Sequence, residues 1–357
     1  MHLTLLTIDW VLLIEKCVLI AIILAISLLI AMYETWAERK VAAFMQDRRG
    51  PNRAGPGGIF QPLADGLKLF MKEEIIPAHS NRWLFVLGPG LAMLTAMMTS
   101  AVVPWSSHFN IAGREVSVQI ADVNIGILYI FGVVSMGVYG VMIGGWASNN
   151  KFSLLAAVRG ASQIISYELS MGLSIIALLM ITGTLSLSRI VEMQQEHHWF
   201  ILVQPLGFLI FLVCAFAECN RTPFDLSEAD SELNMGFHLE YSSMKLGFYL
   251  FSEYVNVFIS SAVMATLYFG GYDIPFVNTA ALAQHWGQNP VAALQVLCFF
   301  VKIAAFIFLF IWVRWTIPRF RYDQLMKLGW HVLIPLALFN MLVTGFIVLL
   351  RANHWHF

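Results

Sequence analysis

Residues 11–33 read VLLIEKCVLIAIILAISLLIAMY, an almost unbroken apolar run of the length that crosses a lipid bilayer as one helix. The run is continuous rather than alternating, so it does not fit the strands of a membrane β-barrel. No small-residue cleavage site follows it, so we do not expect a removable signal peptide. Seven further apolar runs occupy residues 84–103, 125–146, 164–182, 199–217, 246–269, 292–312 and 332–350. We therefore expect an all-α, polytopic integral membrane protein with eight transmembrane helices.

The composition agrees with a membrane domain over the whole of residues 1–357. Hydrophobic residues make up 59% of the chain and charged residues 12%, whereas a soluble domain has about 25% charged residues. The formal net charge of −1 gives no reason to expect nucleic acid as a partner. The four cysteines show neither a CxxC motif nor metal-ligand spacing, so the sequence predicts no disulfide framework, zinc site or iron–sulfur cluster.

The positive charges indicate how the helices are oriented. The loops after the first, third, fifth and seventh apolar runs hold 16 of the 21 lysines and arginines. Cytoplasmic loops of membrane proteins carry such an excess. We therefore expect these loops to face the cytoplasm, or a mitochondrial matrix, and both termini to lie outside, on the periplasmic side.

The first inside loop, residues 34–83, contains the stretch MQDRRGPNRAGPGG, which is too rich in glycine and proline to remain helical. Residues 59–72 then place Ile59, Leu63 and Leu67 on one helical face. Gln61, Asp65 and Lys68 lie on the other face. This pattern predicts an amphipathic helix on the membrane surface. Such a helix can be a simple lipid anchor, or its polar face can form part of a site.

The second unusual inside loop, residues 218–245, is called the acidic loop here. The spacing Asp225-x-x-Glu228 fits a capping box and predicts that a short helix begins there. Glu228 and Glu232 would repel each other on one face of that helix, so we expect basic partners such as Arg39 and Arg319. A solvated charged loop is the alternative. Its six carboxylates and two bases are Glu218, Asp225, Glu228, Asp230, Glu232, Glu240, Arg221 and Lys245.

Several charged residues fall inside or at the ends of apolar runs. Glu168 and Glu253 are inside runs, Glu218 follows one, and Glu34 and Glu38 share a face at the end of the first. Each charge at mid-bilayer costs about 2.5–3.5 kcal/mol if it is left uncompensated. These acids must therefore face one another, water or basic groups. They predict either a buried proton path, since neighbouring carboxylates have coupled protonation, or polar contacts between helices.

Lys302, in the middle of the seventh run, is the cation that could pair with one of these acids.

Four segments of the chain resemble one family closely. They are AERKVAAFMQDRRGPNRAGPGGIFQPLADGLKLFMKEEIIP, RGASQIISYELSMGL, AECNRTPFDLSEADSELNMGFHLEYSSMK and VRWTIPRFRYDQLMKLGW. Together they resemble the H subunit of bacterial NADH:quinone oxidoreductase, respiratory complex I, which is subunit 1 of the mitochondrial enzyme. The departures are Gly160 where the family usually has serine, Trp315 where alanine is common, and Asp230 where glutamate is usual. The third apolar run also lacks a carboxylate that some relatives carry.

The resemblance implies a membrane subunit of a proton-pumping enzyme that uses quinone as substrate. This chain itself would bind no metal, flavin or iron–sulfur cluster. Its implied partners are the peripheral-arm subunits at the quinone site, the small and antiporter-like membrane subunits, and the lipid of the cell inner membrane or mitochondrial inner membrane. The quinone chamber would be lined by Arg39, Gln61, Asp65, Lys68, Arg221, Glu228, Asp230, Glu232 and Arg319. The proton path and its coupling would involve Glu34, Glu38, Glu168, Glu218, Glu253 and Lys302.

Two other interpretations fit part of the sequence. A homologous subunit of a membrane-bound hydrogenase would keep the fold and the acids but change the electron donor. The intact PNRAGPGG and QPLADG stretches favour the quinone enzyme. A stand-alone secondary transporter would use the acids to bind substrate or Na⁺. Against it, the runs show no internal repeat and no pair of glycine- or proline-broken segments in matching halves.

Overall fold

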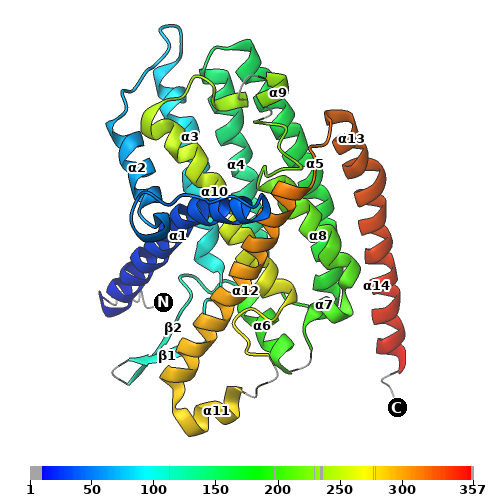
Figure 1. Cartoon of the computed structure of the whole chain (residues 1–357). Helices are drawn as coiled ribbons and strands as arrows, with labels where there is room; N and C mark the ends of the chain where they lie inside the picture. Colours follow the sequence, from blue (N-terminus) through cyan, green and yellow to red (C-terminus); the bar gives the residue numbers. More distant parts are fainter. Residues whose placement is uncertain are drawn as a thin grey trace, which may run out of the picture.

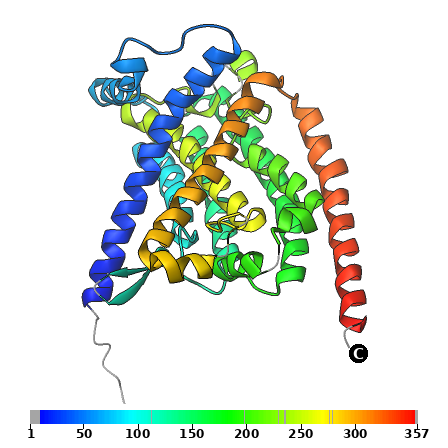
Figure 2. The same ribbon diagram turned by 60° about the horizontal axis from the view of Figure 1, so that its bottom comes forward.

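The computed structural model describes residues 10–111, 113–196, 198–228, 230–233, 236–275, 277 and 279–354. Within them, seven helical segments are long and apolar enough to cross a membrane. Figures 1 and 2 show them as a bundle with α10 near its centre and α14 at one side. They are α1 (Trp10–Met45), α3 (Arg82–Thr99), α4 (Gly126–Ala147), α5 (Lys151–Thr182), α10 (Ser243–Tyr268), α12 (Gln288–Thr316) and the α13–α14 segment (Tyr322–Lys327, Leu328–Leu333, Ile334–His354).

Two of these helices extend well beyond the predicted runs. Helix α1 continues to Met45, so Glu34 and Glu38 lie on it, and it ends where the glycine- and proline-rich stretch begins. Helix α5 begins at Lys151, thirteen residues before the predicted run. Its start is fixed by Asn150, whose side-chain oxygen accepts a hydrogen bond from the Phe152 amide at 3.0 Å. Both extensions carry polar residues into the ordered helices.

The fifth predicted run is interrupted. Its residues form α7 (Phe200–Val203) and α8 (Pro205–Glu218), with non-helical backbone at Gln204 between them. The Gln204 amide is fixed by hydrogen bonds with Thr344 and Asn340 of α14, at 2.6 and 3.0 Å. Helix α8 has 14 residues, fewer than the roughly 20 of a full span. The structure thus supports seven spans directly, and the count of eight stays a prediction.

The connections gather at two opposite ends of the bundle (Figure 1). One end, called the polar end here, carries α2 (Gln61–Met71), the acidic loop with α9 (Asp230–Leu233), and residues 317–321. The other, the hairpin end, carries α6 (Leu187–Glu196), α11 (Thr279–Trp286) and an antiparallel hairpin of β1 (His108–Ile111) and β2 (Arg114–Ser117), in which His108 pairs with Ser117. Three single turns, η1 (Pro56–Gly58), η2 (Ser100–Val102) and η3 (Gly236–His238), complete the described elements.

The amphipathic helix is present as α2, inside the predicted range 59–72. Leu63, Leu67 and Phe70 are exposed, as expected for a face turned to lipid. Helix α2 is attached to the start of α10 because the Ser243 hydroxyl donates to the Leu69 carbonyl at 3.0 Å. Its polar face is therefore held toward the bundle.

The predicted short helix at Asp225 is wrong. Residues 225–228 are not helical, and the described helical turn of this loop, α9, begins five residues later at Asp230. The Asp225 carboxylate accepts a hydrogen bond from Arg319 at 2.7 Å instead of capping a helix. A charged partner brought in from another part of the chain has overridden the local capping preference.

Close helix packing in the core depends on glycine. The buried Tyr249 of α10 donates from its hydroxyl to the Gly140 carbonyl of α4 at 3.1 Å. A Cβ atom at Gly144 would lie within 3.0 Å of the Tyr249 ring carbon that bears this hydroxyl. The absence of a side chain at Gly144 therefore leaves room for the Tyr249 hydroxyl, which joins α10 to α4.

Candidate functional site

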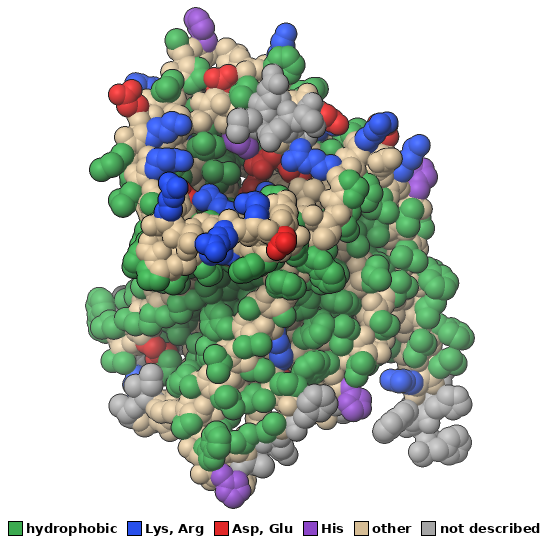
Figure 3. Space-filling view, viewed as in Figure 1, with side chains coloured by type: hydrophobic (Ala, Val, Ile, Leu, Met, Phe, Trp, Pro, Cys, Tyr) green, Lys and Arg blue, Asp and Glu red, His purple; other side chains and the backbone are tan. Residues whose placement is uncertain are grey.

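The charged side chains concentrate at the polar end. Figure 3 shows lysine and arginine side chains gathered there, around a hollow in which acidic side chains are visible, above a broad hydrophobic surface. The lysines and arginines that the sequence places in alternate loops therefore lie together at one end of the folded bundle.

Asp65 joins the surface helix to the first transmembrane helix. Its carboxylate pairs with Arg39 of α1 at 2.7 Å and accepts a hydrogen bond from Gln61 at 3.1 Å. The Arg39 side chain is 51% exposed and the Asp65 side chain 31%. The polar face of α2 thus contacts predicted site residues rather than solvent alone. Lys68 is exposed on the same helix.

Glu38 lies at the centre of a buried charge cluster formed by α1, α10, α12 and the end of α8. Its carboxylate is 2.7 Å from Arg314 and accepts a hydrogen bond from the Tyr254 hydroxyl at 3.0 Å. Arg221 lies 3.8 Å from the same carboxylate, and its guanidinium stacks on the Tyr254 ring at 4.0 Å. Two arginines therefore share one carboxylate.

Glu34 lies one helical turn before Glu38 and is 5% exposed. Its Oε1 atom has no hydrogen-bond partner among the described residues. Glu34 lines a cavity of about 20 Å³ together with Glu38, Arg221 and Arg314, which is enough room for one water-sized molecule. The site thus contains a buried carboxylate oxygen beside a space that can hold a hydrogen-bonding molecule.

Besides Arg221, the acids Asp225 and Glu232 attach the acidic loop to other elements by ion pairs. Asp225 pairs with Arg319 at 2.7 Å, as expected for Arg319, and Glu232 pairs with Arg159 of α5 at 2.6 Å. Arg39, the other expected partner, pairs with Asp65 instead. Burial, together with the neighbouring Glu228, raises the pKa of Asp225 to about 7, although Arg319 opposes the shift. The ion pair with Arg319 thus opposes the effect of burial on this carboxylate without cancelling it.

Glu228 connects the acidic loop to α10. Its Oε1 atom lies 3.3 Å from Nδ1 of His238, and its side chain interacts with that of Glu253. Glu253 is 8% exposed. Asp230 lies in α9, but its side chain falls outside the described residues, as do residues 229, 234 and 235. The structure thus brings Glu228 and Glu253 together. That Asp230 lines the chamber stays a prediction.

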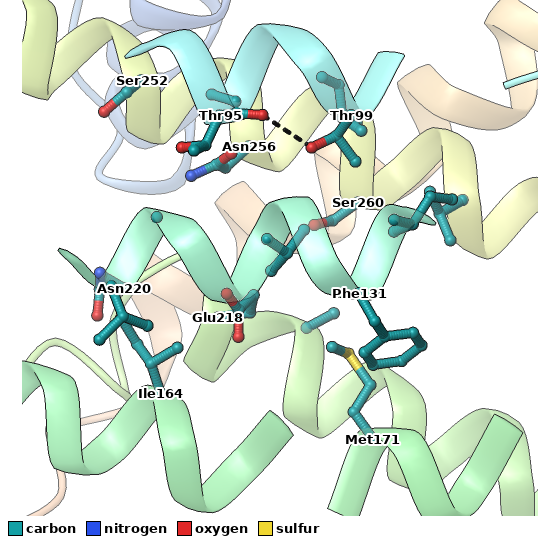
Figure 4. A pocket seen from close by; sticks show the side chains of 18 of the residues that line it. Thr95, Thr99, Phe131, Ile164, Met171, Glu218, Asn220, Ser252, Asn256 and Ser260 are labelled. Atoms are coloured by element: carbon teal, nitrogen blue, oxygen red, sulfur yellow. Dashed lines mark hydrogen bonds between the residues drawn. The ribbon is translucent and has the colours of Figure 1, made fainter. Parts of the chain in front are cut away.

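A cavity of about 80 Å³ continues from Glu253 into the bundle between α3, α4, α5, α8 and α10. In Figure 4, Glu218 points into this space between Asn220 and Ser260, with Asn256 across from it. The Glu218 Oε2 atom is buried and has no hydrogen-bond partner among the described residues. The polar lining residues are Thr95, Thr99, Glu218, Asn220, Tyr249, Ser252, Glu253, Asn256 and Ser260.

Glu168 is half-buried on α5, beside buried core residues of that helix such as Ile164 and Tyr167. It accepts a hydrogen bond from Ser135 of α4 and lines an open groove with Phe131 and Ile165. Ser135 belongs to the run without a carboxylate. Glu168 is also close enough to Glu218 for their charges to interact. The structure therefore brings Glu168 near the other acids while leaving it at the bundle flank.

Lys302 is separated from this cluster. Its ammonium donates to the carbonyls of Phe269, Gly271 and Asp273 at 2.7, 2.8 and 2.6 Å, just beyond the end of α10. It also lies 4.7 Å from the ring centre of Trp199. These contacts compensate backbone carbonyls at the end of a buried helix. Its place in the predicted proton path is not tested by them.

Sequence reasoning missed four residues of the site: Arg314, Arg159, Tyr254 and His238. Arg314 and Arg159 lie inside the quoted motifs, so their charge within a family motif was an available signal. Tyr254 directly follows Glu253 and turns toward Glu38 instead of the cavity. His238 also lies inside a quoted motif, but its relation to Glu228 depends on how the loop folds back.

The fold and the site define a helical membrane protein in which ionisable side chains continue from one end into the bundle. The model of the family described as NADH dehydrogenase matches residues 18–345. Proteins named as the H subunit of NADH-quinone oxidoreductase are similar over nearly the full chain. The chain is 63% identical over 338 residues to one from Cytophaga hutchinsonii, covering 95% of this chain and 98% of that protein. It is 61% identical over 342 residues to one from Flavobacterium psychrophilum, covering 96% and 99%. The chain belongs to this family of H subunits.

Proposed function

We propose that this chain forms the membrane part of the quinone-binding chamber of a proton-pumping NADH:quinone oxidoreductase, and the start of its acidic proton path. The enzyme would lie in the cell inner membrane. The peripheral-arm subunits would supply electrons at the polar end, and the small and antiporter-like membrane subunits would adjoin the acids. Both termini would face the periplasm, with the fifth, shorter helix completing eight crossings.

One observation carries the proposal. Ionisable side chains follow one another from the surface helix to the interior, from Asp65 and Arg39, through Glu38 and Arg221, to Glu228 and Glu253. The polar cavity beside Glu253 continues this series to Glu218. A protein that needed acids only to join helices would pair each of them fully, whereas several oxygens here have no partner among the described residues.

The chemistry of quinone reduction fits this arrangement. Quinone takes up two electrons and two protons to give quinol, with the electrons coming from the partner subunits. Proton uptake from nearby groups leaves unpaired charge in a low-dielectric region, where charges interact strongly. Arg221 and Arg314 share Glu38, so a change in the charge of one acid would shift their balance.

We expect Asp65→Asn and Glu218→Gln, in the complete enzyme, to have different effects. Asp65→Asn removes the carboxylate at the chamber surface and should raise the apparent KM for quinone. Glu218→Gln removes a titratable group beside the cavity and should lower quinone reduction and proton transport together. Rates would be measured with quinone in membrane vesicles.

NADH oxidation by an artificial acceptor that takes electrons before quinone would report assembly in both variants. The matched control for Glu218→Gln is Glu196→Gln, an exposed acid at the hairpin end. Wild-type rates, quinone KM and proton transport in both site variants would contradict the proposal.

A further inference from the structure

We propose that His238 is a positioning residue that exchanges a proton with Glu228 and thereby sets the charge that Glu228 presents to Glu253. This inference rests on the proposed function and adds to it a residue outside the predicted site. It identifies the imidazole of the acidic loop, instead of another carboxylate, as the proton partner of Glu228.

The backbone of the acidic loop builds this contact. The Phe237 amide donates to the Ser227 carbonyl at 3.2 Å, which closes the chain on itself between these two residues. Gly236 has φ +82°, and a Cβ atom there would lie 2.1 Å from the Ser227 carbonyl oxygen. Because only glycine permits this approach, the side chains that follow Ser227 and Phe237 are placed next to each other. Those side chains are Glu228 and His238.

The pair is enclosed. His238 is 8% exposed, and its Nδ1 atom and Glu228 Oε1 are both buried. They lie 3.3 Å apart, and neither atom makes a hydrogen bond to any described residue. Phe237 packs edge-on against the His238 ring and against Tyr249 of α10. Each atom is therefore the available partner of the other.

Several charged groups surround Glu228, so a change in its protonation alters its interaction with each of them. Arg221 comes from the end of α8, Asp225 from the same loop and Glu253 from α10. Two residues beyond His238, Glu240 is bound by Asn150 at 2.7 Å. The Arg221 cation attracts a negative charge on Glu228, whereas ionised Asp225 and Glu253 repel it. The imidazole beside Glu228 Oε1 is that of His238.

The step is a single proton transfer. The Nδ1 proton of the imidazolium moves to Glu228 Oε1, which leaves a neutral imidazole and a neutral carboxyl group. Glu228 can then donate a hydrogen bond to Glu253, which it cannot do when ionised. Histidine suits this exchange because its ordinary pKa lies near neutral pH. The reverse transfer restores the ion pair.

The test uses the complete enzyme with His238→Asn, Glu228→Gln and both together. Asparagine keeps a hydrogen-bonding group but cannot titrate. We expect His238→Asn to lower quinone reduction about tenfold, within the range of interaction energies between neighbouring residues. We also expect it to change the shape of the pH–rate profile, because a group that can exchange a proton is lost. The double variant should be no slower than the slower single variant, because the two residues act as one unit.

The control is His79→Asn, an exposed histidine before α3, which should leave the profile unchanged. A uniform loss at every pH, or multiplicative losses in the double variant, would overturn the role of His238 and indicate a structural contact. That failure is separable from failure of the proposed function, since Glu218→Gln would still impair quinone reduction and proton transport. Wild-type rates in Glu218→Gln and Asp65→Asn would instead contradict the function itself.

Discussion

Lys302 and Arg221 are both cations inside the helix bundle, but they have different partners. Backbone carbonyls surround Lys302, whereas carboxylates surround Arg221. Lys302 donates to three backbone carbonyls at 2.6 to 2.8 Å. Arg221 lies 3.8 Å from Glu38, shares that carboxylate with Arg314, and leaves its Nη2 atom without a partner among the described residues. One charge is saturated by fixed dipoles, and the other belongs to a set of competing partners.

This difference separates two uses of buried charge. Backbone carbonyls cannot change their protonation, so the Lys302 site has one arrangement and serves the end of α10. Around Arg221, the negative partners are carboxylates (Glu38, Glu228 and Glu253), and a carboxylate can gain or lose a proton. A shared, incompletely paired cluster can therefore change its arrangement when one proton moves.

The largest expected effect comes from breaking the saturated site. In Lys302→Met the three carbonyls lose their donor, and each buried unsatisfied group costs about 1–3 kcal/mol. Their sum approaches the roughly 5–15 kcal/mol that typically separates folded from unfolded states. We expect assembled complex in the membrane to fall more than tenfold, measured by quantitative native electrophoresis.

Glu253→Gln serves as the contrast, since it should assemble normally and lose turnover. Normal assembly of Lys302→Met with a selective loss of proton transport would place Lys302 in the proton path, as the sequence first suggested.

A smaller effect is expected from Gly160→Ser. A Cβ atom at Gly160 of α5 would lie 2.8 Å from Cβ of Ser227, so the acidic loop must move away from α5. We expect the enzyme to assemble but to reduce quinone several-fold more slowly, because overpacking typically costs about 1–3 kcal/mol. A loop that can shift should place the cost at the low end of that range. Gly132→Ser is the matched control, because a Cβ atom there meets nothing within 4 Å. Equal rates in both variants would show that the loop position does not matter for turnover.

The sequence predicted the features that depend on long periodic runs or on the quoted motifs. It indicated the apolar helices, the surface helix α2 and the Arg319 contact with the acidic loop. It could not indicate the break at Gln204, which depends on Thr344 and Asn340 of a distant helix. The capping box at Asp225 failed for the same reason, since Arg319 comes from 94 residues away. Gly160, noted as a departure from the family, acquires a physical reason only when Ser227 lies against it.

The smallest expected effect is a pH dependence centred on Asp225. Burial and Glu228 raise its pKa from 3.8 to about 7, so the folded protein holds this proton more tightly than the unfolded chain. The stabilisation linked to the proton is fully present below about pH 4 and is lost as the pH rises through 7. We expect the midpoint of thermal disassembly of the complex to fall between pH 5.5 and 8 by a few degrees more in wild type than in Asp225→Asn, which carries no charge at any pH. The measurement is the loss of quinone reductase activity after brief heating at each pH, with Asp323→Asn, an acid in the first turn of α13, as the control. Identical slopes in wild type and Asp225→Asn would mean that Asp225 stays ionised beside Arg319, and that this end of the loop is a fixed contact like the Lys302 site.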